Sequence, residues 1–335
     1  KFMKTHGWFE NLAVRANIGT VGNQNFQLSQ IMTLYNFLKM YDGVMGAEIM
    51  SIANPELKWQ TTLNRNIGLE FSLLQGLVNL DFNYYSNITK NNLTDIAILP
   101  STGFSTYKAN MGKVRNQGYE FSLSITPIKK NGWIVNAFVN GAHNKNKLLN
   151  ISDALRDYNE VIKENQTAHL NYAGYTQLER IFLFEEGQSL NSIFAVRSMG
   201  IDPGTGQEIF VTADGVQTFQ WNAADQVVVG NTEPTLKGYF GLNVDYKRWS
   251  FGANFQYSFG ADRYNKTLYE KIEGGNFAQN ADRRALTQRW TKPGDVAKYR
   301  GYGNTSQLKP TSRFVQKDDF LSMTSARLSY TLNAN

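Results

Sequence analysis

The stretch that runs from NPELKWQTTLNRNIGLEFSLL (54–74) to NGWIVNAFVNGAHNKNKL (131–148) decides the fold of this chain. Between residues 76 and 90, apolar and polar side chains alternate with a period of two, which is the pattern of a β-strand with one apolar face. Each such run exceeds the five or six residues that are usual for a strand in a soluble protein. The same alternation recurs in three further runs, 59–74, 111–127 and 132–148.

The length and alternation of these runs suit a strand that crosses a membrane. Such a strand needs about 9 to 11 residues, with apolar side chains facing outward and polar side chains facing inward. A large soluble β-sandwich has strands that alternate in the same way, so the period alone leaves both folds open. Ile134 and Phe138 interrupt the pattern in the fourth run.

The order of the connections favours the membrane barrel. Hairpin signals, such as Lys129-Lys130-Asn131-Gly132, alternate along the chain with connections of 20 residues or more. Short turns on one side and long loops on the other are the layout of an outer-membrane barrel, whereas a Greek-key sandwich would not sort its connections in this way. We therefore expect the long loops outside the cell and both chain ends on the periplasmic side. The remaining expected strands are 11–20, 236–248, 249–260 and 319–332, and the long connections are 21–58, 91–110, 149–235 and 261–318.

The longest connection carries three local signals. The charged segment DALRDYNEVIKEN (153–165) suggests a helix, and Ile193 to Val196 suggests a strand. The Gly- and Pro-rich segment IDPGTGQEIF (201–210) favours a turn at Asp202, because it lacks the regular series of oxygen ligands of a calcium loop.

Composition excludes several classes of protein. The mean hydropathy is −0.41 and no apolar segment suggests a transmembrane helix, but a barrel strand is apolar on one face only. The net charge is +6, with 34 basic residues spread among 28 acidic ones, which favours a mixed solvated surface and no nucleic-acid partner. Cysteine is absent, which rules out disulfide scaffolds. The first twelve residues have no apolar signal-peptide core.

Nine segments, taken in order, resemble the SusC/RagA family of TonB-dependent outer-membrane transporters of Bacteroidetes. They are LAVRANIGTVGNQNF (12–26), NPELKWQTTLNRNIGLEF (54–71), LDFNYYSNITKNNL (80–93), NMGKVRNQGYEFSL (110–123), NGWIVNAFVNGAHNKNKL (131–148), GIDPGTGQEIF (200–210), GLNVDYKRWSFGANFQYSFG (241–260), RWTKPGD (289–295) and FLSMTSARLSYTL (320–332).

The resemblance implies an all-β, antiparallel transmembrane barrel of about 22 strands, with an N-terminal plug domain, a periplasmic segment that binds TonB and a SusD-like surface lipoprotein as a lid. It also implies active import of an oligosaccharide or peptide across the bacterial outer membrane. The sequence leaves open whether two transporter complexes pair as a homodimer. We expect residues 1–335 to form a C-terminal part of the barrel, with the plug and the TonB-binding segment outside this chain. A non-transporting surface binding module and a free-standing eight-stranded barrel are the alternatives.

No constellation of an enzyme, metal site or cofactor site is present, so we predict that the protein is not an enzyme. The three histidines, His6, His143 and His169, have no metal-ligand spacing, and neither a nucleophile elbow nor a phosphate-binding loop occurs. Adjacent acids such as Glu185 and Glu186 point to opposite faces of a strand and favour a solvated loop.

The sequence assigns no individual substrate-binding residue. The polar faces of the strands are expected to contact the plug or a wet lumen. Their members are Glu70, Asn79, Asp81, Asn83, Glu120, Asn254 and Gln256. Loop aromatics suit sugar rings and peptide side chains alike, and so are candidates for contact with cargo or lid. They are Tyr172, Tyr175, Trp221, Trp290 and Tyr299, and Arg289 beside Trp290 suggests either ligand stacking or packing of the loop.

Overall fold

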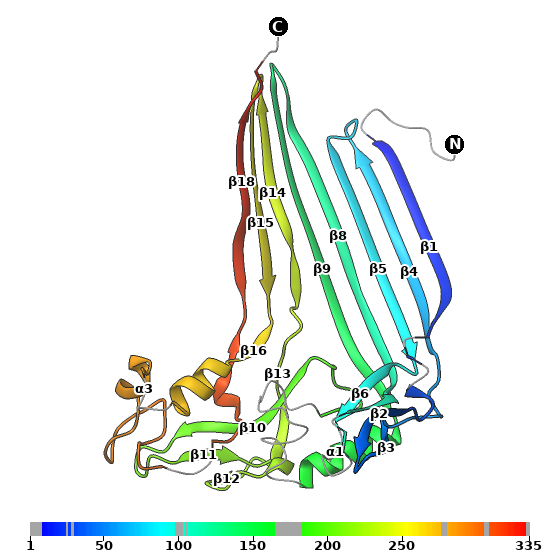
Figure 1. Ribbon diagram of the computed structural model, residues 1–335. Coiled ribbons are helices and arrows are strands. Elements are labelled where there is room, and N and C mark those ends of the chain that lie inside the picture. Colours follow the sequence, from blue (N-terminus) through cyan, green and yellow to red (C-terminus); the bar gives the residue numbers. More distant parts are fainter. Residues whose placement is uncertain are drawn as a thin grey trace.

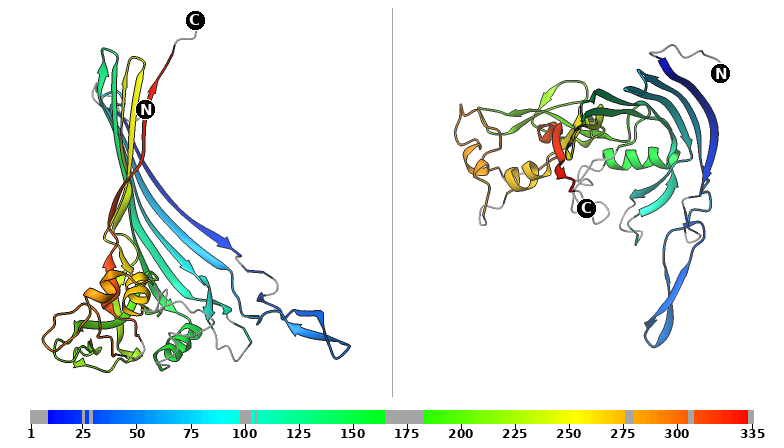
Figure 2. Two further views of the ribbon diagram at one scale, coloured as in Figure 1. Left: turned by 60° about the vertical axis from the view of Figure 1, so that its left-hand side comes forward. Right: turned by 90° about the horizontal axis from the view of Figure 1, so that it is seen from above.

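A long, curved antiparallel sheet organises the molecule (Figure 1, Figure 2). The computed structural model describes residues 9–24, 26–27, 30–97, 103–104, 106–164, 183–275, 280–304 and 308–332. Its eight strands follow the order β1-β4-β5-β8-β9-β14-β15-β18. They are β1 (Phe9–Asn23), β4 (Gln60–Leu73), β5 (Val78–Lys90), β8 (Gly112–Lys130), β9 (Trp133–Ile151), β14 (Leu236–Tyr246), β15 (Trp249–Phe259) and β18 (Phe320–Tyr330).

All eight predicted membrane strands are confirmed, and the short and long connections fall at opposite ends of the sheet. Figure 1 shows the short turns at its upper end, where β1 starts and β18 finishes, and the long connections at its lower end. The β8–β9 turn places Asn131 and Gly132 at φ of 54° and 79°. Positive φ at both central residues is what a two-residue hairpin of the type I′ kind requires, so the predicted Asn-Gly turn is confirmed.

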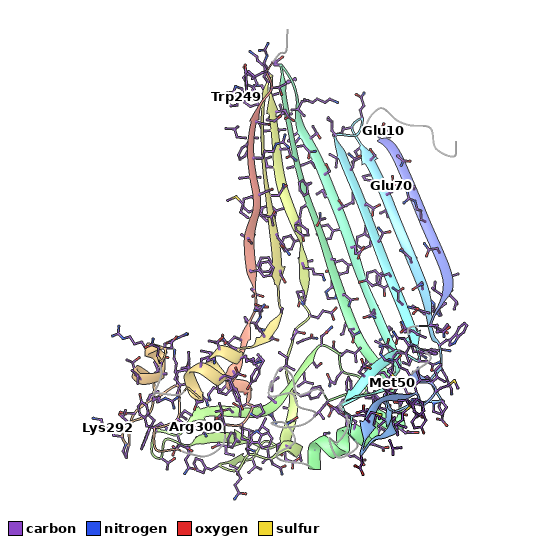
Figure 3. The ribbon with its side chains drawn as sticks, in the orientation of Figure 1. Glu10, Met50, Glu70, Trp249, Lys292 and Arg300 are labelled. Carbon is purple, nitrogen blue, oxygen red and sulfur yellow. The ribbon has the colours of Figure 1, made fainter. Side chains whose placement is uncertain are left out.

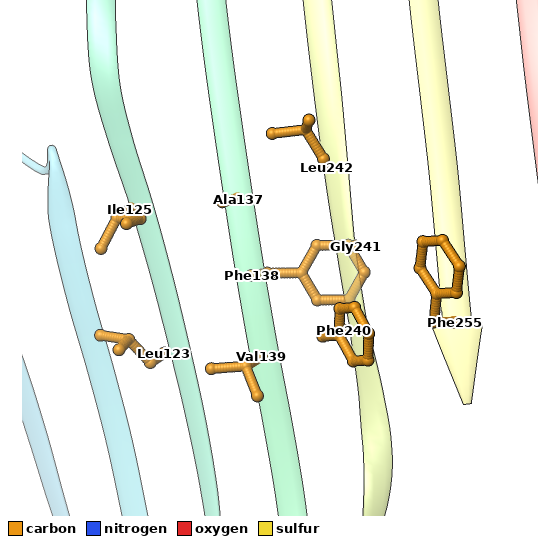
Figure 4. Close-up of a pocket in the computed structure, with 9 residues that line it drawn as sticks. All are labelled: Leu123, Ile125, Ala137, Phe138, Val139, Phe240, Gly241, Leu242 and Phe255. Atoms are coloured by element: carbon orange, nitrogen blue, oxygen red, sulfur yellow. The ribbon is translucent and has the colours of Figure 1, made fainter. Parts of the chain in front are cut away.

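The strand register joins the apolar residues into one continuous face. Leu69 on β4 lies opposite Phe82 on β5, which lies opposite Phe121 on β8. On the other half of the sheet, Leu242 of β14 pairs with Ala137 of β9 and with Ala253 of β15. Figure 4 shows this face around a hollow of about 460 Å³ between β8 and β15. A two-residue period therefore gives an apolar surface across all eight strands.

The polar face lines the concave side of the sheet. Helix α1 (Asp153–Glu164) lies inside the curve in Figure 2, and its Leu155 packs with Val114 and Leu148, which share their face with the polar residues. The helix predicted over 153–165 is thus confirmed. The apolar face is convex, as in a barrel that turns its apolar side toward lipid.

Aromatic side chains mark both edges of the apolar face. At the short-turn end, one row across four strands consists of Trp133, Tyr246, Trp249 and Tyr330 (Figure 3 labels Trp249). Near the long loops, the rings of Tyr119 and His143 are 5.1 Å apart. Ten residues of β9 separate Trp133 from His143, which corresponds to about 33 Å along a strand, or about 25 Å across the membrane at a tilt of about 40°. This spacing equals the height of the apolar band in outer-membrane barrels.

The interruption of the pattern at Phe138 has a local cause. Phe138 lies on the polar side, where its ring covers Gly241 of the neighbouring strand (Figure 4). A Cβ atom on Gly241 would lie 2.6 Å from Cε1 of Phe138, so the glycine makes room for the ring.

The sheet is open, which overturns the alternative of a free-standing eight-stranded barrel. β1 and β18 are the two edges and do not pair with each other. An open edge leaves backbone groups unsatisfied in lipid, so a membrane-embedded sheet of this kind requires further strands.

The long connections carry their own structure. The first holds a hairpin of β2 (Tyr35–Tyr41) and β3 (Val44–Ile49), and the second holds β6 (Leu93–Ala97) and β7 (Thr106–Asn110). No helix among the described residues is long and apolar enough to cross a membrane.

The third and fourth long connections pack together, and we call the described residues of 183–235 and 261–318 the loop unit. Val196 bridges Thr311, and Trp221 donates its indole N–H to the carbonyl of Pro310 at 3.1 Å. The strand predicted at Ile193 to Val196 is confirmed as part of β10. The elements of the loop unit are β10 (Ser192–Ile201), β11 (Glu208–Val211), β12 (Gln217–Thr218), η4 (Ala223–Asp225), β13 (Gln226–Asn231), β16 (Asp262–Tyr264), the π-helical η5 (Leu268–Glu273), α3 (Arg283–Thr287), η6 (Ser312–Phe314) and β17 (Val315–Lys317).

Candidate functional site

A polar hollow on the concave face is the candidate site. It has a volume of about 610 Å³ and spans six strands near their long-loop ends. Amide side chains dominate its lining, and amides both donate and accept hydrogen bonds, so the wall suits a polar occupant. The lining residues are Asn17, Asn64, Asn66, Tyr85, Asn87, Asn116, Glu120, Ala142, Asn144, Glu233 and Lys237.

Hydrogen bonds fix one side of this wall. The Tyr85 hydroxyl donates to Oδ1 of Asn144 at 2.9 Å, and the Asn144 amide donates to a carboxylate oxygen of Glu233. Glu233 precedes β14, and its other oxygen accepts from the backbone N–H of Asn146 at 3.3 Å. Gly118 lies between Tyr85 and Asn144 in the register. A Cβ there would lie 2.9 Å from the Tyr85 hydroxyl oxygen, so the glycine lets Tyr85 cross β8.

We expect Gly118→Ala to destabilise the barrel and to break the Tyr85–Asn144 bond. The added Cβ would lie 2.0 Å from the carbonyl oxygen of His143 in the backbone of β9, which cannot move aside without disturbing the ladder. The loss should be about 1–3 kcal/mol, the cost of overpacking a filled site. The temperature at which the detergent-solubilised protein loses its compact, heat-modifiable gel mobility measures it. Gly19→Ala is the matched control, because among the described residues no atom beyond its chain neighbours lies within 4 Å of that Cβ position.

One row of the hollow separates opposite charges. Ala142 of β9 pairs with Glu120 on one side and with Lys237 on the other. The small alanine leaves open space between the carboxylate and the ammonium group. The predicted inner-face residues, Glu70, Asn79, Asp81, Asn83, Glu120, Asn254 and Gln256, all lie on this polar face by register. Sequence reasoning did not single out Glu233 or most of the asparagines, although pairs such as Asn64 and Asn66 repeat with the strand period.

A buried ion network joins separate elements of the loop unit. Arg313 bridges the carboxylates of Glu208 and Glu273 at 2.9 and 2.7 Å, and Arg300 pairs with Glu273 at 3.0 Å (Figure 3 labels Arg300). Thr311 also donates its hydroxyl to Glu208 at 2.7 Å. The two carboxylate side chains are 4% and 0% exposed. Burial opposes ionisation of Glu273, but Arg313 and Arg300 outweigh it and hold the pKa of this carboxyl below its ordinary value.

The lowered pKa of Glu273 gives the loop unit an acid-sensitive stability. A carboxyl whose pKa is depressed by folding stabilises the fold above its unfolded-state pKa, and this contribution is lost as the pH falls through the folded-state pKa. We therefore expect protease resistance of the loop unit to be constant near neutral pH and to fall once the pH drops below the ordinary value of 4.5. Limited proteolysis of the detergent-solubilised protein across this range measures the effect. Glu273→Gln should lower resistance at pH 7 and flatten the acid-induced decline, and an unchanged acid profile would contradict the assignment.

Arg289 and Trp290 pack the loop unit internally. The Arg289 guanidinium is buried and donates to the carbonyls of Ala285, Arg300, Ile272 and Glu273 at 2.5 to 3.0 Å. Trp290 donates its indole N–H to the carbonyl of Pro203 at 2.9 Å. Of the two interpretations of this pair, the structure supports packing of the loop.

The other predicted loop residues have varied environments. Tyr299 is 6% exposed within a core with Phe314, and the Nζ of Lys309 lies 4.9 Å from the Trp221 ring centroid. The Asp202 carboxylate accepts from the backbone N–H and the hydroxyl of Thr205, which confirms the predicted turn. These Thr205 hydrogen bonds hold the pKa of Asp202 below its ordinary value. Tyr172, Tyr175, His6 and His169 lie outside the described residues.

The part of the chain that the structure describes contains no group of three or more His, Asp or Glu side chains that is able to hold a metal ion. His143 belongs to the aromatic rim of the apolar face, and its Nδ1 lies 2.6 Å from the carbonyl oxygen of Thr235. The concave wall therefore offers hydrogen bonds and charge, and its described residues form no metal centre.

An apolar convex face, aromatic rims at both of its edges and a polar concave wall together define the segment of a membrane β-barrel. The model for the "TonB dependent receptor-like, beta-barrel" family matches residues 7–177, slightly more than half of the chain. The chain belongs to this family of outer-membrane transporters, as the sequence motifs predict.

Similar proteins extend the match over nearly the whole chain. TonB-dependent receptor P39 of Formosa agariphila is 27% identical over 370 aligned residues, which cover 99% of this chain and 35% of that protein. TonB-dependent receptor SusC of Bacteroides thetaiotaomicron is 24% identical over 84% of this chain and 28% of its own length. The chain thus spans about a third of the length of these curated relatives.

The fold matches that of a solved transporter. The RagAB peptide importer in the closed-closed state superposes with a TM-score of 0.80 and 24% sequence identity, over 99% of this chain and 36% of that one. This likeness confirms the sheet and the arrangement of its loops as those of a SusC/RagA-like barrel.

Proposed function

We propose that this chain is the barrel segment of a TonB-dependent importer that carries a nutrient across the outer membrane. The main support for this proposal is the similarity of the fold to the RagAB peptide importer, which covers 99% of this chain and so includes the loop unit. Membership of the TonB-dependent receptor-like family also supports it. The concave polar wall would line the lumen and contact the plug, which we place outside this chain. The apolar face would contact lipid.

The proposed import needs partners that supply energy and enclose cargo. TonB would act through the plug, so that transport changes the position of the cargo and not its covalent structure. A SusD-like surface lipoprotein would cover the loop unit, which lies at the end of the sheet that we place outside the cell (Figure 1). The cargo would be a peptide or an oligosaccharide, and the amide-rich hollow suits the polar groups of both.

Uptake by intact cells tests this proposal. Cells that carry the full-length protein receive either a fluorescent peptide pool or a fluorescent oligosaccharide pool, and accumulation is compared with and without TonB. We expect one pool to accumulate only when both the transporter and TonB are present. Equal accumulation without TonB would contradict energised import, and surface binding of a pool without any accumulation would favour the binding-module alternative.

A further inference from the structure

Basic side chains gather on the convex face, directly beyond its aromatic rim. The rim row contains Tyr84, Tyr119 and His143 on adjacent strands. Residues on one face of a strand repeat every two positions, and the next row toward the long loops consists of Ile18, Arg65, Ser86, Gln117 and Lys145. The row after that contains Arg115 and Lys147. We call Arg65, Arg115, Lys145 and Lys147 the basic rim.

The basic rim has no acidic neighbours in its own rows. Across β1, β4, β5, β8 and β9, neither row contains an aspartate or a glutamate. The Nε of Arg115 is buried and has no hydrogen-bond acceptor among the described residues. In the following row on this face, Lys90 of β5 lies opposite Lys113 of β8, so the positive charge continues toward the loops. Such a concentration of positive charge beside an apolar belt is suited to an anionic ligand.

A hollow on the same face joins the basic rim to the apolar belt. It has a volume of about 530 Å³. Apolar side chains of Ala16, Ile18 and Ile67 line its membrane side, while Arg65, Tyr84 and Ser86 contribute polar groups at the loop side. Figure 1 shows β1, β4 and β5, which carry these residues, side by side along the sheet. An occupant with an acyl chain and an anionic headgroup matches both halves of this hollow.

We infer that the basic rim and this hollow bind the phosphate-bearing headgroup of a lipid in the outer leaflet, with an acyl chain along Ile18 and Ile67. Two features of the convex face select a lipid as the occupant. The hollow is continuous with the lipid-facing belt, and its charged edge lies at the depth where headgroups meet the aromatic rim. Arg65 presents a planar guanidinium that is able to hold a phosphate through two hydrogen bonds.

The test uses the complete transporter complex in detergent and two probes, lipid A that carries phosphate and the same lipid A after enzymatic dephosphorylation. Native mass spectrometry measures how much of each probe remains bound. We expect the phosphorylated probe to bind more tightly. The double variant R65Q/K145Q should weaken its binding about 20- to 30-fold, because each cation near the membrane surface contributes about a factor of five.

The double variant K129Q/K130Q is the matched control, because it removes two positive charges at the short-turn end of β8 and should leave binding unchanged. Unaltered heat-modifiable mobility shows that both double variants remain folded. Equal binding of the two probes, or unchanged binding in R65Q/K145Q, would overturn the inference. Inorganic phosphate that binds as tightly as the phosphorylated lipid would assign the site to free phosphate and would also overturn it.

Discussion

Replacing Arg313 with alanine should lower the free energy of unfolding of the loop unit by about 3–5 kcal/mol, the cost of leaving buried charges without their partner. Arg313 joins Glu208 and Glu273, two carboxylates that are almost fully buried and that come from elements separated by more than sixty residues. Without the guanidinium, Glu208 loses its ion pair and Glu273 retains only Arg300. The carboxylates must then protonate, or the loop unit must open.

Hydrogen–deuterium exchange of the detergent-solubilised protein measures this loss. Exchange should rise throughout β10, β11 and the segment around Glu273, whereas the membrane strands should remain protected. Arg263→Ala is the matched control, since the Arg263–Asp318 pair is largely exposed and should contribute no more than about 1 kcal/mol. Equal exchange in the two variants would show that the buried network does not hold the loop unit together.

Replacing Leu242 with arginine should destabilise the folded barrel by about 2–4 kcal/mol, the cost of a charge on the lipid face near the middle of the membrane. Leu242 lies on the convex apolar face, in the central part of β14 between the two aromatic rims. The neighbouring residue Asn243 points to the opposite face of the sheet. Asn243→Arg places the same charge toward the polar lumen and should have a much smaller effect.

The comparison of Leu242→Arg with Asn243→Arg uses the midpoint of unfolding in urea in the presence of lipid vesicles. Both variants change one residue to arginine on the same strand, so charge and strand propensity are matched. A larger loss for Asn243→Arg would mean that the faces are assigned the wrong way round. Equal losses would contradict the assignment of the two faces, because an arginine would then meet similar surroundings on both sides of the sheet.

The sequence predicted the membrane strands well because their signal is local. The two-residue alternation around Phe82, the Asn131-Gly132 turn and the sorting of short and long connections are each visible in one dimension, and the structure confirms them. The helix over 153–164 and the strand at Ile193 were visible for the same reason. Phe138 broke the pattern because Gly241, about a hundred residues away, accommodates its ring.

The loop unit and the polar hollow could not be predicted in the same way. Arg313 and Glu208 are 105 residues apart, and nothing in the local sequence pairs them. Glu233 reaches Asn144 because it lies three residues before β14, and β14 pairs with β9 although about ninety residues separate the two partners in the sequence. The loop aromatics were chosen for their chemistry, yet burial of Tyr299 depends on tertiary packing that no local pattern encodes.

The central claim is that the convex face of the sheet contacts lipid and the concave face does not. The accessibility of single cysteines along β14 and β15 tests this claim most directly. The chain has no cysteine of its own, so single cysteines can be introduced into the full-length protein after any others are replaced. Intact outer membranes are then treated with a lipid-soluble maleimide or a water-soluble one. We predict that cysteines at Leu242, Val244 and Phe251 react with the lipid-soluble reagent and not with the water-soluble one, whereas cysteines at Asn243, Gly252 and Asn254 show no such preference for the lipid-soluble reagent. Reaction of both sets with the water-soluble reagent would contradict a lipid-facing transporter barrel.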